Sequence, residues 1–227
     1  RLVDEHRDEG RIDVRHLRPH EPQPGPLGEL LRLDVEVVQH LQVVGDEPGG
    51  TALFVDSGAP LEPLLRFVDE HGLTPTHVLR THSHADHVAH EGELGLPVVT
   101  GPLTTGGLVV EAIPTPGHSD DMVCFVVNDS AVFSGDTLFK DAVGGGDYAA
   151  IRSAVMDVYM QMPHDRRVLP GHTDETTIGR EWEENPFVKV WRGVEPEGTE
   201  RVRVNGRDAI LVVWSPDYDG KGKAWVR

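Results

Sequence analysis

The feature that most constrains the fold is a group of metal-type ligands placed where a strand-like run ends. The segment HSHADH holds His82, His84, Asp86 and His87 directly after the short strand-like run THVLRT of residues 76–81. Alternate residues of an extended chain point to the same side, so His82 and His84 can reach one ion. Where the chain turns into a helix, Asp86 and His87 can reach a second ion. The sequence therefore predicts a strand that delivers ligands to two neighbouring sites.

Three further candidate ligands each follow a glycine at the end of a predicted strand, namely His118, Asp136 and His172. Glycine lets the backbone turn tightly and leaves room beside an ion. Imidazole and carboxylate groups suit zinc, manganese or iron without any thiolate. A lone histidine is more often a surface or hydrogen-bonded residue. That interpretation is kept for His6, His16, His20, His40, His71, His77, His90 and His164.

The remaining apolar pattern predicts strands that alternate with helices. In the first helix, Leu61, Leu64, Leu65 and Val68 share one face, and Gly72 ends the helix. Such a mixture is typical of an α/β protein in which sheets pack between helices in layers. Helices are predicted at residues 61–71, 149–162 and 176–185, and strands at 33–44, 51–58, 76–81, 97–100, 108–114, 122–128, 131–136 and 167–170.

The length of 227 residues favours one large domain with extensions. Residues 1–28 are charged and proline-rich without a clean period, which predicts an irregular N-terminal arm. The main domain is expected over residues 29–190. Residues 191–227 are expected to form a β-hairpin extension packed on the same domain, with its turn at Asn205-Gly206.

Composition limits the partners and the compartment. The formal net charge of −17 disfavours a nucleic-acid partner, which normally requires a basic patch. No apolar stretch approaches the roughly 20 residues that a membrane span needs. A single cysteine, Cys124, rules out an internal disulfide, and the charged first residues lack a secretory signal. We therefore expect a cytoplasmic protein with a small-molecule substrate and no membrane or nucleic-acid partner, and make no prediction of its oligomeric state.

The motifs THSHADH, TPGHS, FSGDTLF and LPGHTDETTIGREWEENPF together resemble the metallo-β-lactamase superfamily, and within it the glyoxalase II (hydroxyacylglutathione hydrolase) group. The resemblance covers about residues 51–187 and implies an α/β fold of the αββα four-layer sandwich type, with metals at one edge of the two sheets. Asp56 matches an aspartate that closes an early strand, either as a loop support or as a simple turn residue. The resemblance implies a first metal on His82, His84 and His118, a second on Asp86, His87 and His172, and Asp136 bridging the two.

The function that follows is hydrolysis by two divalent metal ions, with zinc expected and iron or manganese as alternatives. Two such cations lower the pKa of a bridging water to about 7 and supply a hydroxide nucleophile. A thioester such as a hydroxyacyl-thiol conjugate is an easy substrate, because a thiol with a pKa near 8.5 leaves readily. Asp86 is also a catalytic candidate, since a carboxylate there can orient the water or take its proton.

Two other functions stay open. A lactone hydrolase would use the same two-metal site, whereas a persulfide dioxygenase would hold one iron on His82, His118 and Asp136. A β-lactamase is less expected, since the common type needs a second-site cysteine and Cys124 lies inside a predicted strand. The thiol carrier is not assigned, although Lys140 offers a basic candidate. The loop 142–146 is either a pocket wall or an ordinary flexible connection.

Overall fold

The computed structural model describes residues 35–38, 41–204, 206–216 and 222–227. The expected arm over residues 1–28 lies outside the described residues. All described elements belong to one compact unit, which spans Leu31–Arg227. Within the described part of the chain, no helix is long and apolar enough to cross a membrane.

The first sheet combines antiparallel and parallel strands. Strands β1, β2 and β3 pair antiparallel, whereas β3, β4 and β5 pair parallel. The parallel arrangement brings the carboxyl ends of β3 and β4 to the same edge, which is where the predicted ligand segment begins. The sheet order is β1 (Val35–Val38), β2 (Leu41–Gly45), β3 (Thr51–Val55), β4 (Thr74–Leu79) and β5 (Val98–Val99).

Two details of this sheet correct the sequence predictions. The single strand expected at 33–44 is two strands, β1 and β2, which pair antiparallel with Val38 opposite Leu41. The two residues between them in the sequence, Gln39 and His40, are neither glycine nor proline, so the sequence carried no signal for a break. Helix α1 (Glu62–Glu70) buries Leu64 and Val68, and Leu61 and Phe67 pack beside them, but Leu65 is 43% exposed because it lies off this face.

The second sheet carries the other predicted ligands at its strand ends. Strands β6 to β9 pair antiparallel, β9 pairs parallel with β12, and β12 pairs antiparallel with β13. Here too the parallel pair ends at a common edge. The sheet order is β13 (Thr176–Thr177), β12 (Arg167–Pro170), β9 (Ala131–Gly135), β8 (Val123–Val127), β7 (Leu108–Pro114) and β6 (Leu103–Thr105).

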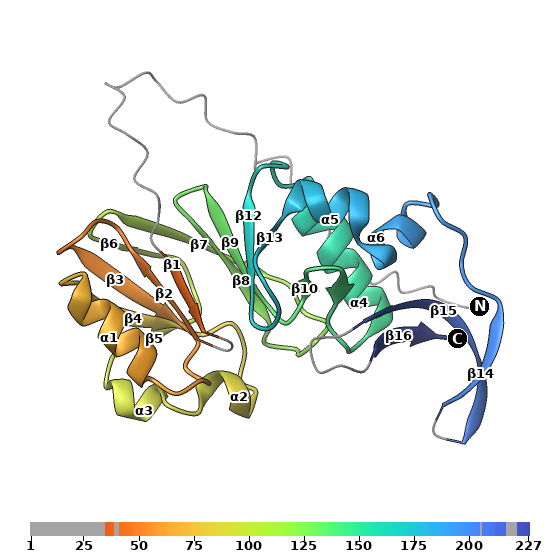
Figure 1. Ribbon diagram of the computed structural model, residues 1–227, viewed down its shortest axis with the longest axis horizontal. Helices are drawn as coiled ribbons and strands as arrows, with labels where there is room; N and C mark the ends of the chain where they lie inside the picture. Colours follow the sequence, from red (N-terminus) through yellow and green to blue (C-terminus); the bar gives the residue numbers. More distant parts are fainter. Residues whose placement is uncertain (1–34, 39–40, 205, 217–221) are drawn as a thin grey trace, which may run out of the picture. The chain divides into compact units, whose positions relative to one another are not determined.

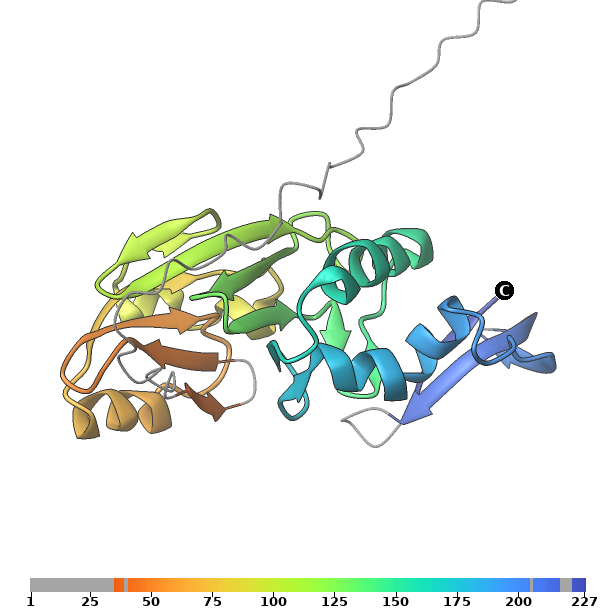
Figure 2. The same ribbon diagram turned by 90° about the horizontal axis from the view of Figure 1, so that it is seen from above.

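A buried core joins the two sheets face to face. Leu53 and Leu79 of the first sheet pack in one cluster with Phe125, Phe133 and Leu169 of the second. The odd and even residues of each strand point to opposite faces, so the second sheet also needs a cover on its other side. Figures 1 and 2 show that α1 lies on the outer side of the first sheet and that the later helices lie beyond the second.

Those later helices complete the four layers. Cys124, Val132 and Val168 of the second sheet pack against Ile151 and Phe187 from the helices. The helix expected at 149–162 begins as α4 and continues as one π-helical turn and one 3-10 turn. The αββα sandwich is therefore confirmed. The covering helices are α4 (Tyr148–Ser153), α5 (Ile178–Glu184) and α6 (Pro186–Trp191).

The C-terminal segment forms a third, smaller antiparallel sheet of β14 (Glu200–Val204), β15 (Arg207–Pro216) and β16 (Gly222–Val226). The expected pairing of β14 with β15 is present, and β16 adds a strand that the sequence did not indicate. Val212 and Val213 of β15 are buried in the same cluster as Phe187. This sheet therefore shares a core with the covering helices.

Candidate metal centre

The loop after β4 is fixed by hydrogen bonds to the end of β3. Thr81 donates to Asp56 twice, from its backbone N and from Oγ1, each at 2.8 Å. Both residues are buried. Helix α2 (Ala85–Val88) begins directly after His84, as the ligand spacing predicted. The start of the HSHADH segment is thus positioned by hydrogen bonds between the ends of two parallel strands, and no ion is needed for this.

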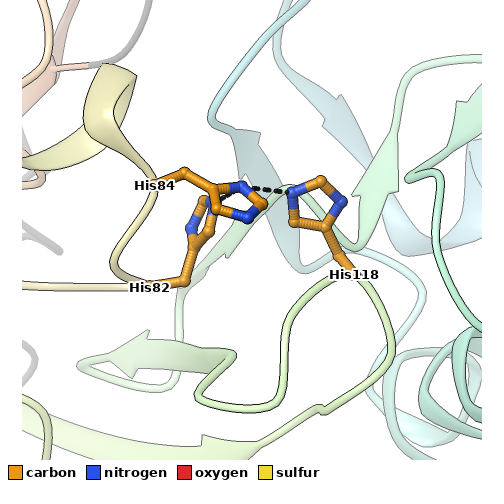
Figure 3. Close-up of side chains that lie close together, drawn as sticks. All are labelled: His82, His84 and His118. Atoms are coloured by element: carbon orange, nitrogen blue, oxygen red, sulfur yellow. Dashed lines mark hydrogen bonds between the residues drawn. The ribbon is translucent and has the colours of Figure 1, made fainter.

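The first group of candidate ligands consists of three imidazoles. His82 Nε2 lies 3.1 Å from His84 Nδ1, and His118 Nε2 lies 2.9 Å from the same His84 atom. Figure 3 shows the three rings facing one another, with His118 reaching in from the loop after β7 (Leu108–Pro114). One nitrogen from each ring lies within 4.8 Å of the other two. These residues form a three-nitrogen set of the kind that binds divalent metals.

The second group combines a carboxylate with two imidazoles. Asp86, His87 and His172 each offer one ligand atom, all within 4.8 Å of one another. His172 Nε2 lies 3.8 Å from Asp86 Oδ2. His87 and His172 are buried, whereas the Asp86 side chain is 56% exposed. This group therefore has two buried imidazoles and one carboxylate that faces solvent.

Asp136 lies between the two groups. Its Oδ2 is 3.6 Å from His118 Nε2 and 3.1 Å from His172 Nε2. Its Oδ1 is 3.4 Å from His87 Nε2. The structure therefore brings all the predicted site residues together, at the edge where β4, β7, β9 and β12 end.

Two glycines leave the room that the sequence suggested. A Cβ on Gly171 would lie 2.6 Å from Asp136 Oδ1 and 2.7 Å from His87 Cε1. Gly135 has a φ of +48°, and a Cβ there would collide with Met122 and Thr81. The positions before Asp136 and His172 are thus glycine because a Cβ at either one would collide with neighbouring side chains.

The electrostatics of the site favour a positive charge on the His87 imidazole. Burial lowers the pKa of this histidine, but hydrogen bonds and charges from Asp136 and Asp56 outweigh burial and raise the pKa to about 10. Burial together with the neighbouring imidazoles lowers the pKa of His82 to about 3. Burial would raise the pKa of Asp136, yet His172 and His87 hold that pKa well below its usual range. The carboxylates of Asp136 and Asp56 that hold a proton on His87 would equally favour a divalent cation there in place of that proton, so the donor set fits divalent cations.

Asp56 orients one of the imidazoles as well as supporting the loop. Its φ is +60°, and its Oδ2 accepts a hydrogen bond from His87 Nδ1 at 2.7 Å. A proton held on Nδ1 leaves Nε2 of His87 for a metal, the usual arrangement around histidine ligands. Of the two roles that the sequence left open, the structure shows the loop support.

The segment that follows Asp136 has several roles. Ala142 and Val143 are buried and form the short strand β11 (Ala142–Val143). The Gly145 carbonyl oxygen lies 2.8 Å from His118 Nδ1 and orients that ring. Lys140, the basic residue considered for binding the thiol carrier, contacts Asp174 Oδ2 at 3.1 Å. Sequence reasoning missed the Gly145 carbonyl, since a backbone atom carries no sequence signal.

The four layers and the clustered imidazoles and carboxylates define a metal-dependent enzyme of the hydrolase type. No protein-family model matches the chain. A hydroxyacylglutathione hydrolase from Rhodopseudomonas palustris (strain BisA53) is 30% identical over 181 residues, which cover 68% of this chain and 67% of that protein. The chain belongs to the metallo-β-lactamase superfamily, and its resemblance to the glyoxalase II group is confirmed.

Solved structures agree with this assignment. The BLEG-1 B3 metallo-β-lactamase has a TM-score of 0.60 at 25% identity, covering 65% of this chain and 93% of that one. ETHE1 from Myxococcus xanthus has a TM-score of 0.59 at 27% identity, covering 68% and 85%. TTHA1623 in a di-iron-bound form has a TM-score of 0.54 at 28% identity, covering 67% and 98%. These proteins share the superfamily fold with this chain, whose His/Asp cluster fits divalent metal.

Proposed function

We propose that the protein hydrolyses a thioester with two divalent metal ions, zinc being the expected metal. The observation that carries the proposal is the position of Asp136. One of its carboxylate oxygens lies near His118 of the first group and near His172 of the second. A carboxylate between two ligand sets suits a pair of neighbouring ions better than a single ion. The di-iron form of TTHA1623 supports the same stoichiometry.

In this proposal, some residues of the chain would hold the ions and others orient the ligands. When bound, the two cations would supply a hydroxide near neutral pH by lowering the pKa of water to about 7. Asp56 holds His87 in one orientation through Nδ1, and the Gly145 carbonyl does the same for His118. The first ion would be held by His82, His84 and His118, and the second by Asp86, His87 and His172, with Asp136 between them.

The exposure of Asp86 supports a role for its carboxylate in proton transfer. Its carboxylate is the most exposed acidic group of the site, whereas Asp136 is buried. We infer that Asp86 orients the attacking water or accepts its proton, in addition to acting as a ligand. A thioester suits this site because its thiolate departs without a strong acid, the thiol pKa being near 8.5. No buried acid is then required beside the leaving group.

Two further observations support the choice of substrate class. The similar protein from Rhodopseudomonas palustris is named a hydroxyacylglutathione hydrolase, which acts on a thioester of a small hydroxy acid. The net charge of −17 disfavours phosphate backbones, so we keep a small molecule as the substrate rather than a nucleic acid. A hydroxyacyl-thiol conjugate is therefore the first substrate to test.

The test is elemental analysis of protein purified without added metal, followed by assays on a lactoyl thioester and on a lactone. We expect about two ions per chain and thioester hydrolysis that a chelator abolishes. Turnover of the lactone alone would favour the lactone hydrolase. One iron per chain, unaffected when His84 or His172 is replaced, would overturn the two-metal site and favour the dioxygenase.

Matched variants separate the two groups of ligands. His118→Ala and His172→Ala should each remove about one ion, since each deletes one of three or four ligands from a different site. His90→Ala is the control, because this partly exposed ring contacts Glu93 at 2.7 Å and lies outside both groups. Equal metal content in all three proteins would contradict the assignment of ligands.

A further inference from the structure

An ion pair closes the loop that carries four of the candidate ligands. Arg80 directly follows β4, and Glu91 is the first residue of the short helix α3 (Glu91–Leu94). The Arg80 Nε donates to Glu91 Oε1 at 2.7 Å, and Arg80 Nη2 donates to Glu91 Oε2 at 2.6 Å. The chain between the two residues includes the whole HSHADH segment. The Arg80–Glu91 pair therefore joins the two ends of the ligand loop.

The geometry and burial of this pair distinguish it from an ordinary surface ion pair. Two N–H groups of one guanidinium meet separate oxygens of one carboxylate, which fixes orientation as well as distance. The side chains of Arg80 and Glu91 are 32% and 15% exposed. The pair between Arg66 and Glu62 on α1 is far more open, at 63% and 85%. Solvent therefore screens the Arg80–Glu91 pair less, and its two partners restrict each other more.

The backbone of the loop is held at its start and in its middle by the first sheet. Arg80 N donates to Val99 O of β5 at 3.0 Å. Ser57, which follows β3, donates from its backbone N to His87 O at 2.7 Å, and its own carbonyl oxygen accepts from His90 N at 3.0 Å. The ion pair adds a side-chain link at the end of the loop, beyond α2.

Asp86 is the candidate ligand whose position depends most on this link. It lies in α2, between the two ends of the loop, and its side chain is 56% exposed. The other two ligands of the second group, His87 and His172, are buried, so the surrounding protein holds their rings directly. In Figure 1, α2 and α3 follow one another at the same end of the first sheet. Loosening α3 would therefore displace α2 and its carboxylate first.

The pair also balances charge near the second ligand group. The hydrogen bonds to Glu91 raise the pKa of Arg80 above its ordinary value; burial opposes this shift, and the charges of Asp121 and Asp56 add to it. Asp56 is the residue that accepts a hydrogen bond from His87, so the guanidinium charge acts on the support of a candidate ligand. Without Glu91, this positive charge would be left unbalanced and would repel divalent cations.

We propose that the Arg80–Glu91 pair holds α2 in position and thereby keeps the second ion bound. Arg80 and Glu91 act through Asp86, so both are positioning residues. The inference rests on the two-metal site of the proposed function and names what retains one of its ions. Both residues lie outside the motif THSHADH, so the resemblance to the superfamily assigns neither of them a role.

Chelator titration of zinc-loaded protein, with the ions counted by elemental analysis, tests the pair. In Arg80→Met, the affinity for one of the two ions should fall about tenfold, as for a lost charge-assisted contact. In Glu91→Gln the fall should be larger, about 30-fold, because the Arg80 charge remains without its partner. The double variant should resemble Arg80→Met, since the unbalanced charge is gone. In a His172→Ala background, which lacks a ligand of the second group, Arg80→Met should not weaken the remaining ion.

Hydrogen exchange of the metal-free protein gives a readout that requires no ion. The amides of residues 85–90 should exchange about tenfold faster in Arg80→Met, while those of β8 and β9 keep their rates. The charge reversal Arg80→Glu with Glu91→Arg should restore most of the protection and of the metal affinity. Arg66→Met is the matched control, because it breaks the exposed pair on α1 and should change neither quantity. If Arg80→Met does not fold, Arg80→Lys replaces it, since lysine keeps the charge but cannot form both hydrogen bonds.

The outcomes distinguish this inference from the proposed function. Unchanged exchange of residues 85–90 and unchanged metal affinity in Arg80→Met would overturn the role of the pair. A lower Tm with unchanged affinity for both ions would also overturn it, because the pair would then stabilise the fold alone. Faster exchange of residues 85–90 in Arg80→Met, together with only one ion in the unchanged protein, would support the hold on α2 and contradict the two-metal site.

Discussion

Gly171 separates β12 from His172 and touches two candidate metal ligands. In Gly171→Ala, the new Cβ would lie 2.6 Å from Asp136 Oδ1 and 2.7 Å from His87 Cε1, closer than real Cβ atoms approach. We expect both ligands to move, metal content to fall by about one ion, and hydrolysis to drop about 100-fold, as for displacements of about 1 Å in other sites. Elemental analysis and thioester assays measure the two effects.

The control for this variant is Gly92→Ala in the short helix α3 (Glu91–Leu94). A Cβ there meets nothing within 4 Å, so metal content should stay the same. Stability should rise slightly, because alanine is the better helix former by up to about 1 kcal/mol. Full metal retention in Gly171→Ala would show that the close approach is relieved without moving Asp136.

At this scale the sequence predicted which candidate ligands lie together in the structure. Spacing in HSHADH and the glycine before each of His118, Asp136 and His172 were local signals, and parallel strands bring such ends to one edge. The last strand could not be predicted in the same way. The position of β16 depends on the contact between Trp225 and Tyr148 of α4, and no local pattern encodes a contact between residues so far apart in the sequence.

Asp46 connects two turns of the opposing sheets. It lies in the turn between β2 and β3, where its carboxylate accepts hydrogen bonds from Glu47 N at 2.8 Å and Thr51 N at 2.7 Å. Its other oxygen accepts from Gly107 N, in the turn between β6 and β7, at 2.7 Å. Asp46→Ala should lower the free energy of unfolding by about 1 kcal/mol, after allowance for solvent screening.

The contribution of Asp46 to the free energy of unfolding should fall as the pH is lowered. Burial is the largest single influence and raises the pKa of Asp46, but the backbone N–H donors together outweigh it and hold the pKa below its usual value. A lowered pKa in the folded state means that the stabilisation is full above the unfolded-state pKa and is lost as the pH falls through the lower, folded-state pKa.

The free energies of unfolding of the unchanged protein and of Asp46→Ala, measured in urea, should therefore differ by a constant amount near neutral pH. The difference should shrink as the pH falls from about 5 towards 3. Glu47→Ala serves as the control in the same turn, because its exposed side chain should add no such difference. A difference that does not vary with pH would contradict the role of the Asp46 carboxylate.

Among the elements, the errors of prediction occur where the sequence carries no signal for a break. Gln39 and His40, between β1 and β2 in the sequence, are neither glycine nor proline, and the period of 149–162 does not reveal that α4 changes into a π-helical turn. Local propensity does not determine either feature. By contrast, the strand expected at 108–114 has the bounds of β7, because turn residues flank it on both sides.

At the scale of the whole molecule, the metal centre joins the two sheets. The first ligand segment follows β4 of one sheet, whereas Asp136 and His172 follow β9 and β12 of the other. Ions bound by both should stabilise the sandwich by about 4 kcal/mol when free metal exceeds the Kd by about 1,000-fold. For a chain of this size, such a difference corresponds to a Tm roughly 10 °C higher.

Calorimetry before and after treatment with a chelator measures this shift. The Tm should fall on chelation and return when zinc is added back, while the helix signal in circular dichroism stays at its original level at room temperature. An unchanged Tm in protein shown to have lost its metal would mean that the sheets are held together by their shared core alone.

The separation of the candidate ligands from the C-terminal sheet bears on how such a protein diversifies. All the predicted ligands lie between His82 and His172, whereas the C-terminal sheet is encoded after them. The candidate ligands and this sheet therefore occupy different stretches of the gene. Recombination that replaced the segment after Gly198 would leave the whole candidate ligand set in place.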